Sequence, residues 1–327
     1  MNPDLLEILS CPDCRGSLTL SVTDENGGRI ESGTLQCTSC GRSYPIVRYI
    51  PRFVPADSYA NSFGFQWNRF RATQLDSHTG LTISRERFFK ESRWMPEELT
   101  TKRVLDVGCG AGRFAEVALS ADANVVAIDY SSAVETCFAN LGSNPRLSVI
   151  QADVYQLPVK PGVFDYVYCF GVLQHTPNPH RAVLALASPL KEGGKLALDF
   201  YPRLLANILW PKYWLRPFTR RMSQERLFAI VQWLVPKLLP ISRALAAVPL
   251  FGRRLRYLLP VMMYYGVLPL THEQHREWAI LDTFDMLAPL HDHPQTAASV
   301  RAWLTGAGMR DVEAAREGLV VGRAVKG

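Results

Sequence analysis

The sequence lacks the features of a membrane-spanning, secreted or disordered chain. It has no uninterrupted apolar run near the ~18 residues that cross a bilayer. Residues 1–4 open neither a basic nor a long apolar stretch, so we expect no secretory signal. With 327 residues, 47% of them hydrophobic and 20% charged, disorder and collagen-like structure are excluded. We expect a soluble chain with one large domain and one small one.

Cysteine is scarce overall, and acidic residues are scarce in one segment. Four of the seven cysteines lie in the first forty residues, which indicates one metal site in a reducing cytoplasm and not a disulfide framework. Residues 201–260 hold eleven Lys and Arg but only one acid, Glu225, a local charge of +10, whereas the whole chain carries +6. Clustered positive charge predicts an anionic partner: a phosphate, a nucleic acid or an anionic membrane surface.

The four early cysteines form two C-x2-C pairs, Cys11 with Cys14 and Cys37 with Cys40. Two such pairs present four thiolates in a tetrahedron, which suits Zn2+ and leaves no open ligand position. We therefore predict a structural zinc ion, with an iron site or an unmetallated ribbon as alternatives. Alternation over residues 17–22 and a turn at 26–28 predict short antiparallel strands between the pairs.

Residues 5–14, the second cysteine pair and residues 44–51 resemble the small zinc-ribbon family that includes activator subunits of tRNA methyltransferases. The resemblance implies a zinc ribbon, which we expect over residues 1–56. Such ribbons bind RNA, dock partners or serve as structure. Because this segment is not basic, we favour structure or docking.

From residue 102 onward, short apolar strands alternate with helical patterns. We expect strands at 103–107, 124–128, 147–150, 164–168 and, after a turn at 191–194, at 195–200. This alternation predicts an α/β fold with a doubly wound, mostly parallel sheet. In such sheets a ligand lies at the carboxyl ends of the strands.

A G-x-G-x-G loop and an acid after the next strand predict a nucleotide-type ligand. Gly108, Gly110 and Gly112 follow the first strand, and Asp129, which ends the second, is placed to bind two ribose hydroxyls. This arrangement alone does not exclude a dinucleotide as the ligand. Two details favour S-adenosylmethionine (SAM): the pyrophosphate spacing of glycines is missing, and Asp106 would repel a pyrophosphate but attract an ammonium group.

Residues 104–113, 126–129, 151–153, 164–167 and 190–194 together resemble the class I SAM-dependent methyltransferases. The resemblance implies a Rossmann-like seven-stranded sheet, closed by an antiparallel strand pair at 310–316 and 319–325. It also implies cofactor contacts. These fall on Asp106, Gly108, Gly110 and Gly112 at the methionine part, Asp129 and Tyr130 at the ribose, Asp153 and Val154 at the adenine, and Phe170 beside the cofactor.

We expect four regions along the chain: a zinc ribbon (1–56), a helical lid or linker (57–101), the SAM-binding core (102–200 and 297–327), and a helical basic cap with a substrate loop (201–296). Within the lid, Gln66, Trp67 and Arg69 are candidates for contact with cofactor or substrate. The cap mixes tryptophans with arginines, including Arg253, Arg254 and Arg256. It encloses the acceptor, contacts a membrane peripherally, or simply presents a solvated basic face.

The candidate catalytic residues lie in two places. His175, on the loop after the fourth strand, is a candidate general base, with an ordering role for that loop as the alternative. Asp282, Asp285, His291 and His293 form a second cluster, together with Asp292. We interpret this cluster as a substrate-facing loop. The alternatives are capping of a helix at 296–305 and a second metal site.

The expected function is methyl transfer from SAM to an oxygen or carbon of a small-molecule or lipid-linked acceptor, such as a saccharide or a natural-product intermediate. Oxygen or carbon is favoured because residues 170–173 do not match the loop typical of amino methylation. An RNA (tRNA or rRNA) methyltransferase is the first alternative. A non-catalytic docking or activator protein is the second.

Overall fold

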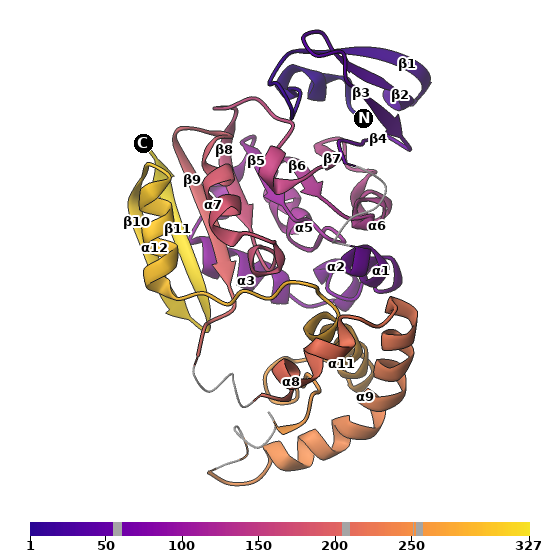
Figure 1. The fold of residues 1–327 in the computed structure, drawn as a ribbon, viewed down its shortest axis with the longest axis vertical. Helices are drawn as coiled ribbons and strands as arrows, with labels where there is room; N and C mark the ends of the chain where they lie inside the picture. The colour runs from indigo at the N-terminus through magenta and orange to yellow at the C-terminus, as the bar shows by residue number, and fades with distance from the viewer. Residues whose placement is uncertain (55–60, 205–209, 251, 253–257) are drawn as a thin grey trace.

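The computed structural model describes residues 1–54, 61–204, 210–250, 252 and 258–327. Three parts follow one another along the long axis of the molecule (Figure 1): an antiparallel ribbon at the N-terminal end, an α/β layer in the middle, and a helical lobe at the far end. The predicted fold class is confirmed.

The ribbon is a four-stranded antiparallel sheet in the order β1-β2-β3-β4. Its elements are η1 (Pro3–Ile8), β1 (Leu18–Asn26), β2 (Arg29–Cys37), β3 (Ser43–Val47) and β4 (Ile50–Pro51). The predicted turn joins β1 to β2, where Gly27 and Gly28 adopt positive φ.

The central sheet has seven strands in the order β10-β11-β9-β8-β5-β6-β7. The five strands β5 to β9 pair in parallel, and β11 pairs antiparallel with both β9 and β10. The strands are β5 (Arg103–Val107), β6 (Asn124–Asp129), β7 (Leu147–Gln151), β8 (Phe164–Cys169), β9 (Leu190–Phe200), β10 (Met309–Glu317) and β11 (Leu319–Lys326). The turn expected at 191–194 was wrong, because these residues lie within β9, where the pairing with β8 is irregular and Gly193 adopts positive φ.

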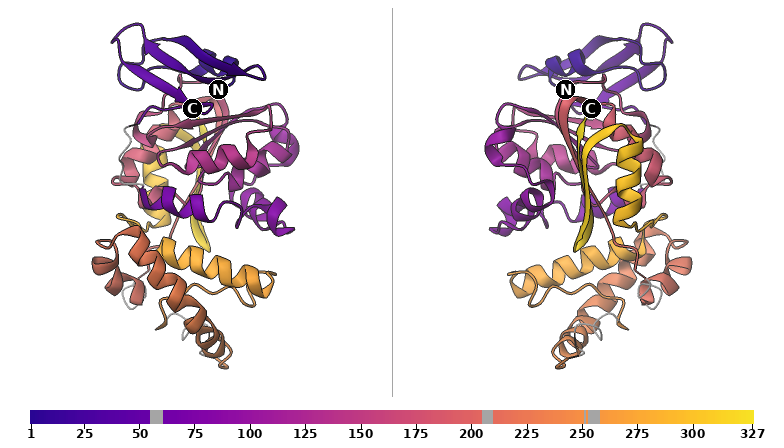
Figure 2. Two further views of the ribbon diagram at one scale, coloured as in Figure 1. Left: turned by 90° about the vertical axis from the view of Figure 1, so that its right-hand side faces the viewer. Right: turned by 90° about the vertical axis from the view of Figure 1, so that its left-hand side faces the viewer.

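Helices cover both faces of this sheet (Figure 2). The elements around it are α1 (Asn61–Arg69), α2 (Asp76–Thr79), α3 (Ile83–Ser92), α4 (Pro96–Leu99), α5 (Arg113–Ser120), α6 (Ala133–Leu141), η2 (Val154–Gln156), η3 (Leu173–His175), α7 (Pro179–Ala187) and α12 (Ala297–Gly306). Alternate residues of each strand enter different cores: Val104 packs in the core that contains Phe114 of α5, and Leu105 in the core that contains Leu186 of α7.

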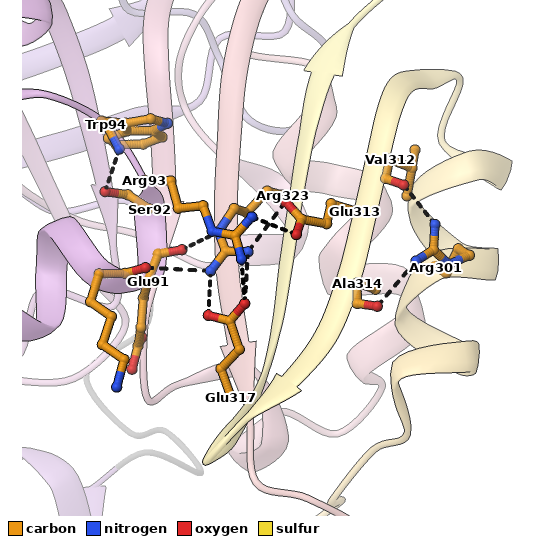
Figure 3. Close-up of polar contacts among 11 residues, drawn as sticks. Glu91, Ser92, Arg93, Trp94, Arg301, Val312, Glu313, Ala314, Glu317 and Arg323 are labelled. Carbon is orange, nitrogen blue, oxygen red and sulfur yellow. Dashed lines mark hydrogen bonds and ion pairs between the residues drawn. The ribbon is translucent and has the colours of Figure 1, made fainter.

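The closing strand pair is tied to α3 by an ion-pair network (Figure 3). Arg93 contacts Glu313 and Glu317 of β10, each at 2.6 Å, and the Arg323 guanidinium of β11 lies 2.8 Å from Glu317. Arg323 also donates to the Glu91 carbonyl at 2.6 Å. These contacts hold α3, which borders the site described below, against the edge of the sheet.

The ribbon is continuous with the central sheet and its core. At the β7 edge, the Phe53 amide donates to the Gln151 carbonyl at 2.8 Å, and Arg52 forms a parallel bridge with Gln151. Ribbon side chains such as Leu5 and Leu35 belong to the same hydrophobic cluster as the α7 face of the sheet. Loss of the ribbon would therefore expose part of the main core.

The far lobe, here called the cap, consists of α8 (Pro211–Thr219), α9 (Gln224–Ala246) and α11 (His272–Leu287) with their described connections. Its own core joins α9 to α11 and includes Val231, Val235, Leu281 and Phe284. The helices expected in this segment are present. Arg253, Arg254 and Arg256, singled out in the sequence, lie outside the described residues.

One helix among the described residues, α9, is long and apolar enough to cross a membrane by length and composition. A third of its most apolar window (33%) is buried in the protein. The sequence has no uninterrupted apolar run at this helix, because Lys237 lies within it.

Candidate functional site

A large cavity of about 1350 Å3 lies at the carboxyl ends of β5, β6 and β8. The loops after these strands, α1, α3 and the cap all contribute residues to the lining. Of the residues expected at the cofactor, the lining includes Gly108, Gly110, Asp129, Tyr130, Val154 and Phe170. The lid contributes Phe63, Gln66 and Trp67. Arg69 instead stacks on the Phe65 and Phe228 rings, at 4.3 and 4.9 Å.

The glycine loop has no space for side chains. Gly108, Gly110 and Gly112 all adopt positive φ, at 85°, 52° and 95°. A Cβ on Gly108 would lie 2.3 Å from the Val172 side chain, and one on Gly110 would lie 3.0 Å from the Trp67 indole nitrogen. Glycine is therefore required both by the backbone and by the close approach of the loop's neighbours.

Asp129 is held in a fixed orientation at the end of β6. One carboxylate oxygen accepts from the Gly110 amide at 3.0 Å, and the other accepts from the Ser131 amide and hydroxyl at 2.8 and 2.7 Å. Burial raises the pKa of Asp129, and the bonds from Ser131 and Gly110 oppose that rise. A carboxylate fixed at the cavity wall beside the glycine loop fits recognition of paired hydroxyls.

Asp106 and Asp153 are not part of the cavity lining. Asp106 is 2% exposed, and burial raises its pKa to about 8 despite the nearby Tyr168 phenol. The Asp153 carboxylate caps η2 by accepting from the Tyr155 amide at 3.0 Å. Asp153 therefore presents the adjoining Val154, which lines the cavity.

His175 lines the cavity, and one of its two ring nitrogens has no hydrogen-bond partner among the described residues. Its Nδ1 lies 3.1 Å from the His291 carbonyl oxygen, which can only accept, so Nδ1 carries the proton. Nε2 then carries the lone pair, and it has no hydrogen-bond partner among the described residues. Burial lowers the pKa of His175, so the imidazole is neutral at pH 7.

The segment around His291 and His293 lies behind His175 and does not line the cavity. The His291 carbonyl fixes the His175 ring, and the His293 amide donates to the Gln174 carbonyl at 2.8 Å. Asp292 is paired with Lys212 of α8 at 2.8 Å, and both side chains are almost fully buried. This position suits support of the His175 loop and not contact with an acceptor.

The two alternative interpretations of this cluster were a second metal site and the capping of a helix. In the part of the chain that the structure describes, the four-cysteine cluster is the only group placed to hold a metal. The expected helix is α12, and the Thr296 side chain caps it by accepting from the Ser299 amide at 3.1 Å.

Asp282 and Asp285, by contrast, face the cavity from α11. Asp282 accepts from the Tyr264 hydroxyl and from Gln74 at 3.3 Å, and burial raises its pKa to about 6. Asp285 accepts from the Tyr201 hydroxyl at 3.4 Å. Asp282, Asp285 and Tyr264 of the cap therefore form, together with Tyr201, a polar group in the cavity lining.

Arg87, Arg113 and Asp199 also belong to the site, although the sequence did not single them out. Arg87 of α3 lines the cavity and pairs with Asp199 at 2.5 Å, while Asp199 accepts from the Gly171 amide at 2.6 Å. Arg113 also lines the cavity and donates to Gln74 and Ser84. The position of Asp199 near the end of a parallel strand was the available signal, because such ends meet at the ligand edge.

The four ribbon cysteines are gathered in one cluster. Their sulfur atoms all lie within 4.8 Å of one another, with Cys11 and Cys40 at 3.7 Å and Cys14 and Cys37 at 3.4 Å. A tetrahedral site with Zn–S bonds of about 2.3 Å needs sulfur separations of about 3.8 Å. The cluster therefore fits zinc without rearrangement of the backbone.

Comparison with known proteins agrees with these two sites. Residues 105–198 match the family described as a methyltransferase domain, and residues 2–48 match the family described as Trm112p-like protein. These matches define the class of each part: a class I SAM-dependent methyltransferase domain, preceded by a Trm112p-like zinc ribbon. The cofactors that these matches support are SAM and structural zinc, and the four cysteines fit the zinc.

Individual relatives resemble parts of the chain. The ubiquinone biosynthesis O-methyltransferase of Xanthomonas euvesicatoria is 39% identical over 105 residues, which cover 31% of this chain and 44% of that protein. An uncharacterized chloroplastic methyltransferase of Arabidopsis thaliana is 26% identical over 58% of this chain and 60% of its own length. A solved complex of the Haloferax volcanii Trm112 methyltransferase activator with a methyltransferase has a TM-score of 0.46 at 14% identity, covering 81% of this chain and 98% of that one. The chain spans less than half the length of the ubiquinone-pathway relatives it matches.

Proposed function

We propose that this protein transfers a methyl group from SAM to a hydroxyl oxygen of a small, largely apolar acceptor. The observation that carries the proposal is that both the glycine loop and His175 line one cavity, while the buried Nε2 of His175 has no hydrogen-bond partner among the described residues. The methyltransferase family match and the O-methyltransferase names of several relatives support the reaction class.

For the cofactor, the proposed contacts follow the cavity wall. The glycine loop would lie along the methionine part, with the buried carboxyl group of Asp106 behind that loop. Asp129, with Tyr130 beside it, binds the ribose hydroxyls. Val154, presented by Asp153, borders the adenine, and Phe170 packs beside the cofactor. When bound, SAM supplies a methyl group made electrophilic by its sulfonium.

For the acceptor, His175 is the proposed general base. With SAM bound, Nε2 would accept the hydroxyl proton as the acceptor oxygen bonds to the methyl carbon, the sulfur–methyl bond breaks and a neutral thioether leaves. The His291 carbonyl would stabilise the resulting imidazolium through Nδ1. Asp282 and Asp285 orient the acceptor through its polar groups. The apolar walls exclude water, which would otherwise compete for the same polar groups.

The substitution His175→Asn tests the assignment of the base. Asparagine can still donate to the His291 carbonyl from the position of Nδ1, but it has no group at the position of Nε2. We expect SAM affinity, measured by calorimetry, to be unchanged, while transfer from methyl-labelled SAM to a host-cell extract falls by about 10²-fold or more. Near-normal transfer would limit His175 to ordering the loop.

The same assay separates the reaction classes. Label in the lipid-extractable or small-molecule fraction supports the proposal. Label in RNA would favour the alternative motivated by the Trm112p-like ribbon. An absence of both transfer and SAM binding would favour a docking protein.

A further inference from the structure

The cap exposes an unusual share of the large apolar side chains. Sixteen such residues are exposed among the described residues, and eleven of them lie between Trp214 and Val267. Phe218 is 67% exposed, Trp233 62% and Ile241 50%. Scattered exposed hydrophobic residues are ordinary, but a concentration in one lobe marks an interaction surface.

Helix α9 carries two apolar stripes. The inner stripe, which includes Leu227, Val231 and Val235, is buried against α11. The outer stripe contains Ile230, Trp233 and Ile241, and these residues are all exposed. At 3.6 residues per turn the outer three lie on one face, which is turned away from the inner stripe. A surface helix of a soluble protein carries polar residues there.

Positive charge borders this apolar face. In residues 210–250 five basic residues are exposed, and Glu225 is the single acid. The five are Arg220, Arg221, Arg226, Lys237 and Arg243. The Lys237 ammonium lies 3.4 Å from the Trp233 ring centroid, so a cation is stacked directly on an exposed aromatic ring. Exposed aromatic and aliphatic side chains bordered by cations suit the boundary between anionic headgroups and acyl chains.

The packing of the inner stripe determines how α9 would be oriented at a membrane. Because Phe228 and Phe284 pack edge to face at 5.7 Å within the cap core, the helix cannot cross a bilayer without unfolding the cap. It would instead lie along the surface, with the outer stripe inserted.

The cavity lining also includes exposed residues of the cap. Leu258 and Val267 line the cavity and are also 61% and 59% exposed. Met262, Leu268 and Pro269 continue the lining from the cap. Apolar residues of the cap, two of them exposed, therefore line the same cavity as Asp282.

We propose that the outer face of the cap docks on an anionic membrane, and that the acceptor is a lipophilic alcohol or phenol that enters the cavity from that membrane past Leu258 and Val267. The docking stands on the surface alone, whereas the identity of the acceptor rests on the proposed function.

Vesicle flotation of the full chain tests the docking. We expect binding to vesicles that contain phosphatidylglycerol, little binding to pure phosphatidylcholine, and weaker binding as salt is raised. Arg220→Gln with Arg221→Gln should weaken binding by roughly tenfold or more, at about 1 kcal/mol per basic residue. Phe218→Ser with Trp233→Ser should weaken it comparably. Met95→Ser is the matched control, because Met95 is 60% exposed outside the cap.

The outcomes distinguish the two proposals. Calorimetric SAM binding should be the same in all variants, which verifies the fold. Absence of vesicle binding by the wild type, or equal binding by the cap variants and the control, would overturn the docking. Sedimentation that shows a dimer separated by Phe218→Ser with Trp233→Ser would assign the face to a second copy of the chain instead. Vesicle binding without methyl transfer would refute the proposed function and leave the docking intact.

Discussion

The buried ion pair between Lys212 and Asp292 gives a prediction whose size follows from the structure. The Lys212 Nζ lies 2.8 Å from the Asp292 carboxylate, with side chains 5% and 3% exposed, and the next cation, the Arg216 guanidinium, is 4.0 Å away. Lys212→Met removes the close partner and leaves a buried carboxylate. Such a loss costs about 3–5 kcal/mol, because the unpaired charge has neither water nor a full partner.

An exposed pair provides the control. Lys191 lies 2.7 Å from Asp165, almost the same distance, but its side chain is 44% exposed. Lys191→Met should cost about 0–1 kcal/mol, since water screens the exposed pair. The double variant Lys212→Met with Asp292→Leu should recover most of the stability, because an apolar pair replaces a charged one.

Urea unfolding followed by tryptophan fluorescence measures all three variants, because four of the seven tryptophans lie in the cap (Trp210, Trp214, Trp233 and Trp278). A cost for Lys212→Met below about 1 kcal/mol, equal to that of Lys191→Met, would refute the claim that burial determines the strength of this pair. If the double variant were as unstable as Lys212→Met alone, the loss of stability would come from altered packing and not from the broken ion pair.

Three further predictions concern the cofactor, the metal and the base. Asp129→Asn keeps the shape of the side chain but removes its charge, so SAM affinity measured by calorimetry should fall by roughly 100-fold; unchanged affinity would reject the ribose assignment. Cys37→Ser should abolish zinc binding, measured by metal analysis, and lower the thermal midpoint of the whole chain because the ribbon shares the main core; full metal content would reject the four-thiolate site. The transfer rate should fall as the pH is lowered, with a midpoint below 6.5, because burial lowers the pKa of His175 and protonation removes the base; a midpoint above 6.5 would contradict the assignment.

Local sequence signals were sufficient for the strands of the sheet and for the cluster of cysteines. The run 103–107 followed by glycines, and the acid at the end of the next strand, are features of neighbouring residues, and they appear in the structure as β5, the glycine loop and Asp129. At 191–194 the same kind of local signal was misleading. The glycines there indicated a turn, but they lie within β9.

Contacts between distant segments could not be predicted in the same way. Asp292 and its neighbouring histidines were expected to face a substrate, yet the pairing with Lys212, eighty residues earlier, turns the segment toward the back of His175. Arg87 enters the cavity because α3 packs on the sheet beside Asp199. These positions depend on how the cap and the lid fold over the sheet, which no local pattern encodes.

The central claim is that one cavity holds SAM next to a lipophilic hydroxyl acceptor. Its most direct test is incubation of the purified chain with methyl-labelled SAM and host-cell membranes and cytosol, followed by separation into RNA, protein, lipid-extractable and soluble small-molecule fractions. We expect base-stable label in the lipid-extractable fraction, and we expect it to be lost with His175→Asn. Label confined to RNA would contradict it.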